Sequence, residues 1–234
     1  MTETLTFPPL MWDEAANGPA FDHAVMRAVT GCDAGLIAHR LRPEAMQAAL
    51  VFAPEVVLPK AMAMLPACAV GLQNALGALA PPEVAVHLDW DGGIRVNGAA
   101  CGSFRVMAST QDPEQTPDWL VVGFDLPLMP GVPDMGEAPD ATALYAEGCA
   151  DVTPPALLEA WARHTLNWVT RWESDGPSSL HAEWRGLVHG IGEEATLCGE
   201  TGTFLGADED FGALIRSGEN TRIIPLTALL EEAP

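Results

Sequence analysis

The residues that could do chemistry in this chain are few and widely spaced. There is one lysine, Lys60, so a mechanism that needs an ammonium group must use it or do without. The five cysteines form no CxxC pair and the six histidines are isolated, so we predict no metal site. Cys101 and Cys149 could act as nucleophiles only beside a base or cation, and buried structural thiols are the simpler interpretation. We find no Walker phosphate loop, dinucleotide fingerprint or serine nucleophile elbow.

The stretch HLDWDGGIRVNGAACGSF, residues 87–104, contains the clearest local signal. Apolar and polar residues alternate on both sides of Asp91-Gly92-Gly93, and this pattern is typical of two strands joined by a tight turn. A further strand is expected directly afterwards, at residues 103–109. The stretch therefore predicts a hairpin of two strands followed by a third strand.

The elements that must position this hairpin are a mixture of helices and strands. Helices are expected at residues 20–31, 60–79 and 153–172, the last with Thr153 as its cap and Pro154 in its first turn. Further strands are expected at 35–42, 48–55, 83–90, 93–98 and 119–126, and a loop rich in proline and glycine at 127–139. We therefore expect an α+β fold in which one mixed sheet packs against helices.

The pattern changes after Pro177. From Trp184 onward, five short segments separated by glycine turns are typical of strands: LVHG, ATLCG, GTFLGAD, GALIRSG and TRIIPL. Short strands at this density predict a small β-barrel. We therefore expect a core domain at residues 1–180 and a small C-terminal β-barrel domain at residues 181–234.

The charge of the chain limits its partners. There are 32 acidic and 11 basic residues, which gives a formal net charge of -21. Such a field repels nucleic acid and anionic membrane surfaces, so neither is expected as a partner. The N-terminal region has no signal-peptide pattern, and no uncharged apolar run reaches the roughly 18 residues of a membrane span. With cysteines that suit reduced thiols, these features predict a cytoplasmic location.

Four stretches, in their order, resemble the biotin and lipoate protein ligase family. The segment at 86–102 is similar to the family's tryptophan motif and lysine-containing turn, and WLVVGFDL at 119–126 is similar to a later strand. DATALYAEG at 140–148 resembles the segment before the long C-terminal helix, and residues 202–216 resemble the small SH3-like barrel of biotin ligases. The resemblance implies that ATP activates the carboxylate of biotin or lipoate, and that a carrier-domain lysine then receives the acyl group.

Two parts of the family pattern are absent. The lysine that lies against the carboxylate and phosphate oxygens corresponds to Ala100, or to Ala99 if the register shifts by one. The glycine- and arginine-rich loop over the adenylate corresponds only to residues 39–43 and a short polar run before Leu50, without glycine. Asp125 also stands where a glycine is usual. Because an acyl phosphate forms between two anions, these cations matter for the reaction, and its catalytic residues stay unassigned.

The resemblance implies a ligand on the sheet face near Trp90, Asn97, Gly98 and Gly102, with the first strands supplying an apolar channel. Four arginines are candidates to replace the missing lysine, because a guanidinium binds carboxylate and phosphate well; they are Arg40, Arg42, Arg95 and Arg105. The alternative interpretation is that each arginine is a solvated residue on a strand face and binds no ligand.

Two functions therefore stay open. The first is a ligase-like protein of altered or lost catalysis that binds a small acyl ligand or its adenylate. The second is an active biotin, lipoate or related acyl ligase or acyltransferase, in which arginines replace the lysine and ATP with biotin or lipoate is required. A carrier-domain protein and a second copy of the chain are the protein partners that the resemblance implies.

Overall fold

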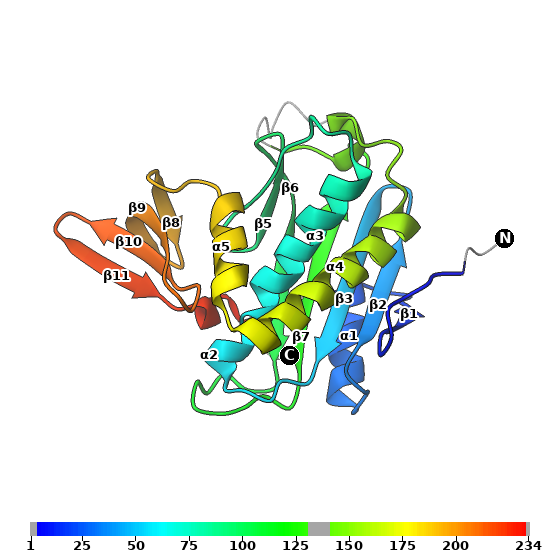
Figure 1. The fold of residues 1–234 in the computed structure, drawn as a ribbon, viewed down its shortest axis with the longest axis horizontal. Helices are drawn as coiled ribbons and strands as arrows, with labels where there is room; N and C mark the ends of the chain where they lie inside the picture. The colour runs from blue at the N-terminus through cyan, green and yellow to red at the C-terminus, as the bar shows by residue number, and fades with distance from the viewer. Residues whose placement is uncertain (1–3, 131–140, 233–234) are drawn as a thin grey trace.

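The computed structural model describes residues 4–130 and 141–232, which form a seven-stranded sheet with helices on both faces and a separate four-stranded sheet (Figure 1). The strand order of the large sheet is β1-β2-β3-β7-β6-β5-β4. The pair β1–β2 is parallel and the other neighbouring pairs are antiparallel. The sheet is therefore mixed, and the predicted α+β class is confirmed.

The strands of the large sheet match the prediction with one addition. The predicted strands are β2 (Leu36–Leu41), β3 (Ala45–Phe52), β4 (Val86–Leu88), β5 (Gly93–Val96), β6 (Ala99–Ala108) and β7 (Leu120–Pro127). The addition is β1 (Trp12–Ala15), an edge strand of four residues. It was missed because parallel pairing with β2 holds it in place, and no local sequence pattern indicates such a distant contact.

Helices cover both faces of this sheet. On one face, α1 (Ala20–Val29) packs its Phe21, Ala24 and Val25 side chains into a small core. On the other face, α2 (Leu58–Ala61), α3 (Met64–Leu79) and α4 (Pro154–Asp175) join the larger core. The helix predicted at 60–79 is thus divided in two. Pro66 lies in the first turn of α3, where its missing N–H costs no intrahelical hydrogen bond.

The long apolar segment Leu58–Leu79 is a core element. Among the described residues, it is long and apolar enough to cross a membrane by length and composition alone. However, 72% of its most apolar window is buried inside the protein. The side chain of Thr165 on α4 lies so close to Gly71 on α3 that a methyl group there would overlap it. Close helix packing of this kind is what a buried core helix shows.

The C-terminal unit contains one helix and four strands. They are α5 (Ser178–Leu187), β8 (Glu194–Leu197), β9 (Glu200–Ala207), β10 (Ala213–Ser217) and β11 (Asn220–Ile224). The strands form an antiparallel sheet in the order β11-β10-β9-β8. The strand predicted at LVHG is wrong, because Leu187 ends α5 and Val188 makes only an isolated bridge with Leu88. Closure into a barrel stays a prediction, and position 180 lies within α5.

Two short 3-10 helices complete the description, η1 (Leu144–Glu147) and η2 (Leu226–Leu229). The predicted loop at 127–139 begins where β7 ends, at Pro127, and its residues 131–139 lie outside the described part of the chain.

Candidate functional site

A row of polar side chains crosses the large sheet on the face that α1 partly covers. Strand register places Arg40 opposite Gln47, Gln47 opposite Asp125, and Asp125 opposite Ser103. Residues two apart on a strand share a face, and Ala38, two residues before Arg40, lies in the core beneath α1. The four side chains, which we call the polar row, therefore project from the α1 face.

Arg40 and Gln47 leave hydrogen-bonding groups without partners in this row. Arg40 is half-buried and makes no hydrogen bond or ion pair through its side chain within the described residues. The Gln47 amide nitrogen donates to the Asp125 carboxylate, while its Oε1 is buried and accepts no hydrogen bond. A buried acceptor without a partner costs free energy, so a ligand that donates to Gln47 and places an anion on Arg40 would relieve both.

Beside the polar row, the α1 face of the sheet is made of small residues, which we call the floor. The aromatic ring of Phe21, on α1, covers them. Ala38, Ala49 and Gly123 lie in register across β2, β3 and β7. A methyl group on Gly123 would lie 2.9 Å from the Phe21 ring. The ring, 6% exposed, therefore fills the space above the floor, where an apolar channel was expected.

Arg105 lies on the same face, two residues along β6 from Ser103. Its Nε and Nη2 each donate to a different carboxylate oxygen of Glu231 at 2.6 Å. Its guanidinium carbon lies 4.4 Å from the centre of the Phe21 ring, and Asp22 is 3.7 Å from its Nη1. The hydrogen bond with Glu231 raises the pKa of Arg105. This arginine is thus an anion-binding group whose anion comes from the chain itself.

Gly102 borders the polar row through a close backbone approach. Its φ is 106°, in the left-handed region that favours glycine. A methyl group at this position would overlap the carbonyl oxygen of Asp125 on β7. Of the predicted site residues, Arg40 and Arg105 therefore share the α1 face, and Gly102 lies beside them in the backbone of β6.

Trp90 is buried where the hairpin meets the C-terminal unit. It is 3% exposed, and its Nε1 donates to the carbonyl oxygen of Phe211 at 2.7 Å, which joins the hairpin to the C-terminal unit. The cavity beside it has a volume of about 10 Å³, and Leu65, Trp184 and Leu226 contribute to its lining. A space of that size holds roughly one water molecule and no acyl chain.

The remaining predicted site residues organise the turn between β5 and β6. Arg95 Nε donates to the Asp89 carboxylate at 2.7 and 3.0 Å, and its Nη1 donates to the carbonyl of Gly98 at 3.0 Å. Asn97 has a φ of 50°, accepts from the Ala85 N–H at 3.0 Å, and donates to Glu147 at 2.8 Å. These contacts account for Arg95, Asn97 and Gly98 without a ligand.

At the two positions where the resemblance implied cations, the described structure has Ala100 and the short connection between β2 and β3. The backbone N–H of Thr142 donates to the carbonyl of Ala100 at 2.8 Å, and the short Ala100 side chain is exposed. Strand β2 ends at Leu41 and β3 begins at Ala45, so residues 42–44 connect the two strands where the resemblance implied a glycine- and arginine-rich loop. Lys60 lies in α2, on the opposite side of the sheet from the polar row.

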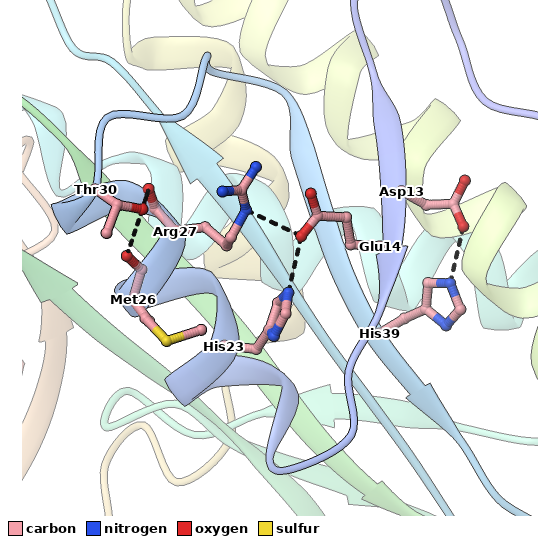
Figure 2. A network of polar contacts seen from close by, with 7 residues as sticks. All are labelled: Asp13, Glu14, His23, Met26, Arg27, Thr30 and His39. Carbon is pink, nitrogen blue, oxygen red and sulfur yellow. Dashed lines mark hydrogen bonds and ion pairs between the residues drawn. The ribbon is translucent and has the colours of Figure 1, made fainter.

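A second polar network holds the edge strand β1 against α1 (Figure 2). The Glu14 carboxylate lies 2.9 Å from His23 Nε2 and 3.0 Å from Arg27 Nε, and the hydrogen bond with His23 lowers the pKa of Glu14. Asp13 contacts His39 Nε2 at 2.9 Å, apart from the Glu14 group in Figure 2. These ion pairs explain how a four-residue edge strand is retained.

The cysteines do not provide a nucleophile. Burial raises the pKa of Cys101 to about 12 and also raises the pKa of Cys149. Both thiols therefore stay protonated near neutral pH. Within residues 4–130 and 141–232, no group of three or more His, Cys, Asp or Glu side chains could hold a metal ion.

Sequence reasoning missed three of the groups on the α1 face: Gln47, Ser103 and Glu231. Gln47 and Ser103 enter the polar row only through strand register. Glu231 reaches Arg105 across 126 residues of sequence. Asp125 did carry a signal, because it replaces a glycine of the family pattern.

Most of the chain matches one protein-family model. Residues 7–186 match the Biotin/lipoate A/B protein ligase family, and residues 191–232 match a domain of unknown function, DUF4444. A biotin protein ligase-like protein of unknown function from a Silicibacter species is 61% identical, with a TM-score of 0.93, over 98% of this chain and 100% of that chain. No curated protein matches this sequence.

Two biotin protein ligases resemble the chain in fold. The Aquifex aeolicus enzyme in complex with biotin and ATP has a TM-score of 0.70 and 16% identity, over 92% of this chain and 94% of that chain. The Leishmania major enzyme in complex with biotinyl-5-AMP has a TM-score of 0.54 and 16% identity, over 93% and 99%. At these identities the likeness establishes the fold alone.

Proposed function

Because the chain belongs to the biotin/lipoate A/B protein ligase family, we propose that it is a member that has lost adenylate formation and binds a small acyl carboxylic acid. The ligand lies on the α1 face of the large sheet, with its carboxylate on Arg40. The observation that carries the proposal is the Arg40 guanidinium, which has no hydrogen-bond or ion-pair partner in the described part of the chain, in register with Gln47, whose buried Oε1 has none there either.

Loss of adenylate formation is supported by the charges of the α1 face. Removing one preorganised charge partner from an active site typically costs about 3–4 kcal/mol, or roughly 10²–10³ in rate. Here the lysine position is Ala100 and the phosphate loop is reduced to residues 42–44. Asp125 adds a carboxylate to the polar row, and a carboxylate repels phosphate oxygens.

Binding of an acid at Arg40 is compatible with that carboxylate. Arg40 lies on β2 and Asp125 on β7, with β3 between them. Adjacent strands are about 4.8 Å apart, so the two charges are separated by roughly 10 Å, about one Debye length at 0.1 M salt. A ligand with one carboxylate can therefore bind Arg40 without direct repulsion from Asp125, whereas a triphosphate extends across the row.

The alternative is an active acyl ligase that uses arginines, ATP and biotin or lipoate, with a carrier domain as acceptor. An active ligase of this kind needs more than one arginine side chain in contact with the ligand. Arg105 is bound by Glu231 and Arg95 by Asp89, which leaves Arg40 and the exposed Arg42 for this role. A cytoplasmic location and a homodimer are compatible with both functions, but neither function requires them.

Calorimetric titration of the purified protein with octanoate, biotin, lipoate and hydrolysis-resistant adenylates of biotin and lipoate tests the proposal. We expect binding of at least one free acid, no tighter binding of its adenylate, and no ATP–pyrophosphate exchange. Exchange above background, or an adenylate bound much more tightly than its acid, would favour the active ligase instead.

A further inference from the structure

The end of the chain returns from the small sheet to the large one (Figure 1). We call residues 226–231 the C-terminal strap. Leu226 is buried, Leu230 forms a parallel bridge with Val106, and the Glu231 N–H donates to the Val106 carbonyl at 3.0 Å. The pairing of β5 with β6 extends only to Ser103, so the strap pairs with β6 beyond that limit.

This backbone pairing places the Glu231 carboxylate on the α1 face. There it holds the Arg105 guanidinium by two hydrogen bonds of 2.6 Å. Bidentate pairing of this kind is how arginine recognises a carboxylate ligand. Arg105 shares the face with Ser103, and the Asp125 carboxylate is close enough to act on its charge. Glu231 thus lies where a carboxylate bound beside the polar row would also lie.

We infer that Arg105, with Phe21 beneath its guanidinium, is a second carboxylate-binding site on this face, and that Glu231 occupies it as an internal competitor of an external acid. The inference rests on the proposed function for the identity of that acid. The Phe21 ring supports the flat face of the guanidinium, so its N–H groups bind at the edge, where Glu231 accepts from Nε and Nη2 and Asp22 lies 3.7 Å from Nη1. Release of Glu231 would provide the α1 face with a second available arginine beside Arg40.

The competing explanation is that the ion pair only fastens the strap. The two explanations differ in their effect on ligand affinity. If Glu231 competes with a ligand, its loss strengthens acid binding. If it only fastens the strap, its loss weakens the fold and leaves acid binding unchanged or weaker.

The test compares Glu231→Gln with Glu232→Gln, a matched change at the exposed neighbouring residue. Octanoate is titrated into each full-length variant by calorimetry, after thermal unfolding has shown that each is folded. Because the pair is partly exposed, we expect Glu231→Gln to bind about three- to tenfold more tightly than the original protein. Glu232→Gln should not change the affinity, and Arg105→Gln in the Glu231→Gln background should remove the gain. Equal affinities for the two single variants would overturn the inference.

A second measurement separates this inference from the proposed function. Inorganic phosphate is titrated while the Arg105 Nε–H signal is followed by NMR. A saturable shift in Glu231→Gln, and a much weaker one in the original chain, supports the Arg105 site even if no acyl acid binds. Equal shifts of the Nε–H signal in the two proteins, or no shift in either, would show that Glu231 does not occupy an anion-binding site on Arg105.

Discussion

The backbone of Gly102 lies against the carbonyl oxygen of Asp125, so closely that a methyl group on Gly102 would overlap that oxygen. Gly102 combines this contact with a φ of 106°. The approach joins β6 to β7 at the polar row, and so aligns Asp125 with Ser103 on the α1 face.

Replacing Gly102 with alanine should therefore destabilise the protein strongly. Left-handed strain and the collision with the Asp125 carbonyl together predict a loss of about 2–4 kcal/mol in the free energy of unfolding. Gly98→Ala is the matched control, because Gly98 has a φ of 90° but open space around its Cα. It should lose only about 1–2 kcal/mol. Urea unfolding measures both, and equal losses would show that the close approach contributes nothing.

Trp90→Phe should weaken the connection between the core and the C-terminal unit. The change keeps an aromatic ring but removes the Nε1–H that donates to Phe211, and it leaves a buried carbonyl oxygen without that donor. We expect a loss of about 1–3 kcal/mol. Trp172→Phe, at a half-buried position on α4, is the control and should lose less. If urea unfolding gives the two variants the same stability, the hydrogen bond is unimportant.

Elements with strong local signals were predicted well. The helix predicted at 153–172 has a proline in its first turn and a regular apolar face, and the structure confirms it as α4, with Thr153 at the N-cap position but without a side-chain capping hydrogen bond. The hairpin around Gly92 was equally clear. The helix α5 was missed, because its ten residues directly follow Gly176 and Pro177, which were interpreted as the end of helical structure.

The site was less predictable, because register and distant contacts create it. Arg40 was identified by its charge, whereas Gln47 joins it only through the pairing of β2 with β3. Trp90 and Arg95 were assigned from the family pattern, and in the structure their polar groups bind Phe211 and Asp89 instead. Sequence alone cannot indicate which arginines are already paired.

The Glu14 network predicts a pH-dependent contribution to stability. The hydrogen bond with His23 lowers the pKa of Glu14 from its ordinary value of 4.5 in the folded protein. A lowered folded-state pKa means that the contribution is present above the ordinary value and is lost as the pH falls through the lowered one. Glu14→Gln should therefore cost about 0.5–1 kcal/mol near neutral pH, and the difference should shrink toward zero as the pH falls below 4.5 and through the lowered pKa of Glu14.

Urea unfolding of both proteins across this pH range provides the measurement. Glu83→Gln, at an exposed position, is the control and should differ little from the original protein at any pH. A Glu14→Gln difference that is constant with pH would show that the carboxylate charge is not responsible.

Restoring the lysine alone should not restore adenylate formation. Ala100→Lys supplies an ammonium group, but the turn at residues 42–44 still provides no loop to enclose the phosphates. We expect no ATP–pyrophosphate exchange with biotin or lipoate in this variant, nor in Ala99→Lys, which covers the other register. Exchange in either variant would mean that one missing cation accounts for the loss.

The central claim is that Arg40 binds the carboxylate of a small acyl acid. Calorimetric titration of octanoate, biotin and lipoate into the original protein, Arg40→Gln and Arg185→Gln tests it most directly. Arg185→Gln removes the same charge from an exposed position on α5. We predict that one acid binds to the original protein and to Arg185→Gln, and about tenfold or more weakly to Arg40→Gln, as expected for loss of a charged hydrogen bond. Equal binding to all three proteins, or no binding to the folded original protein, would contradict the claim.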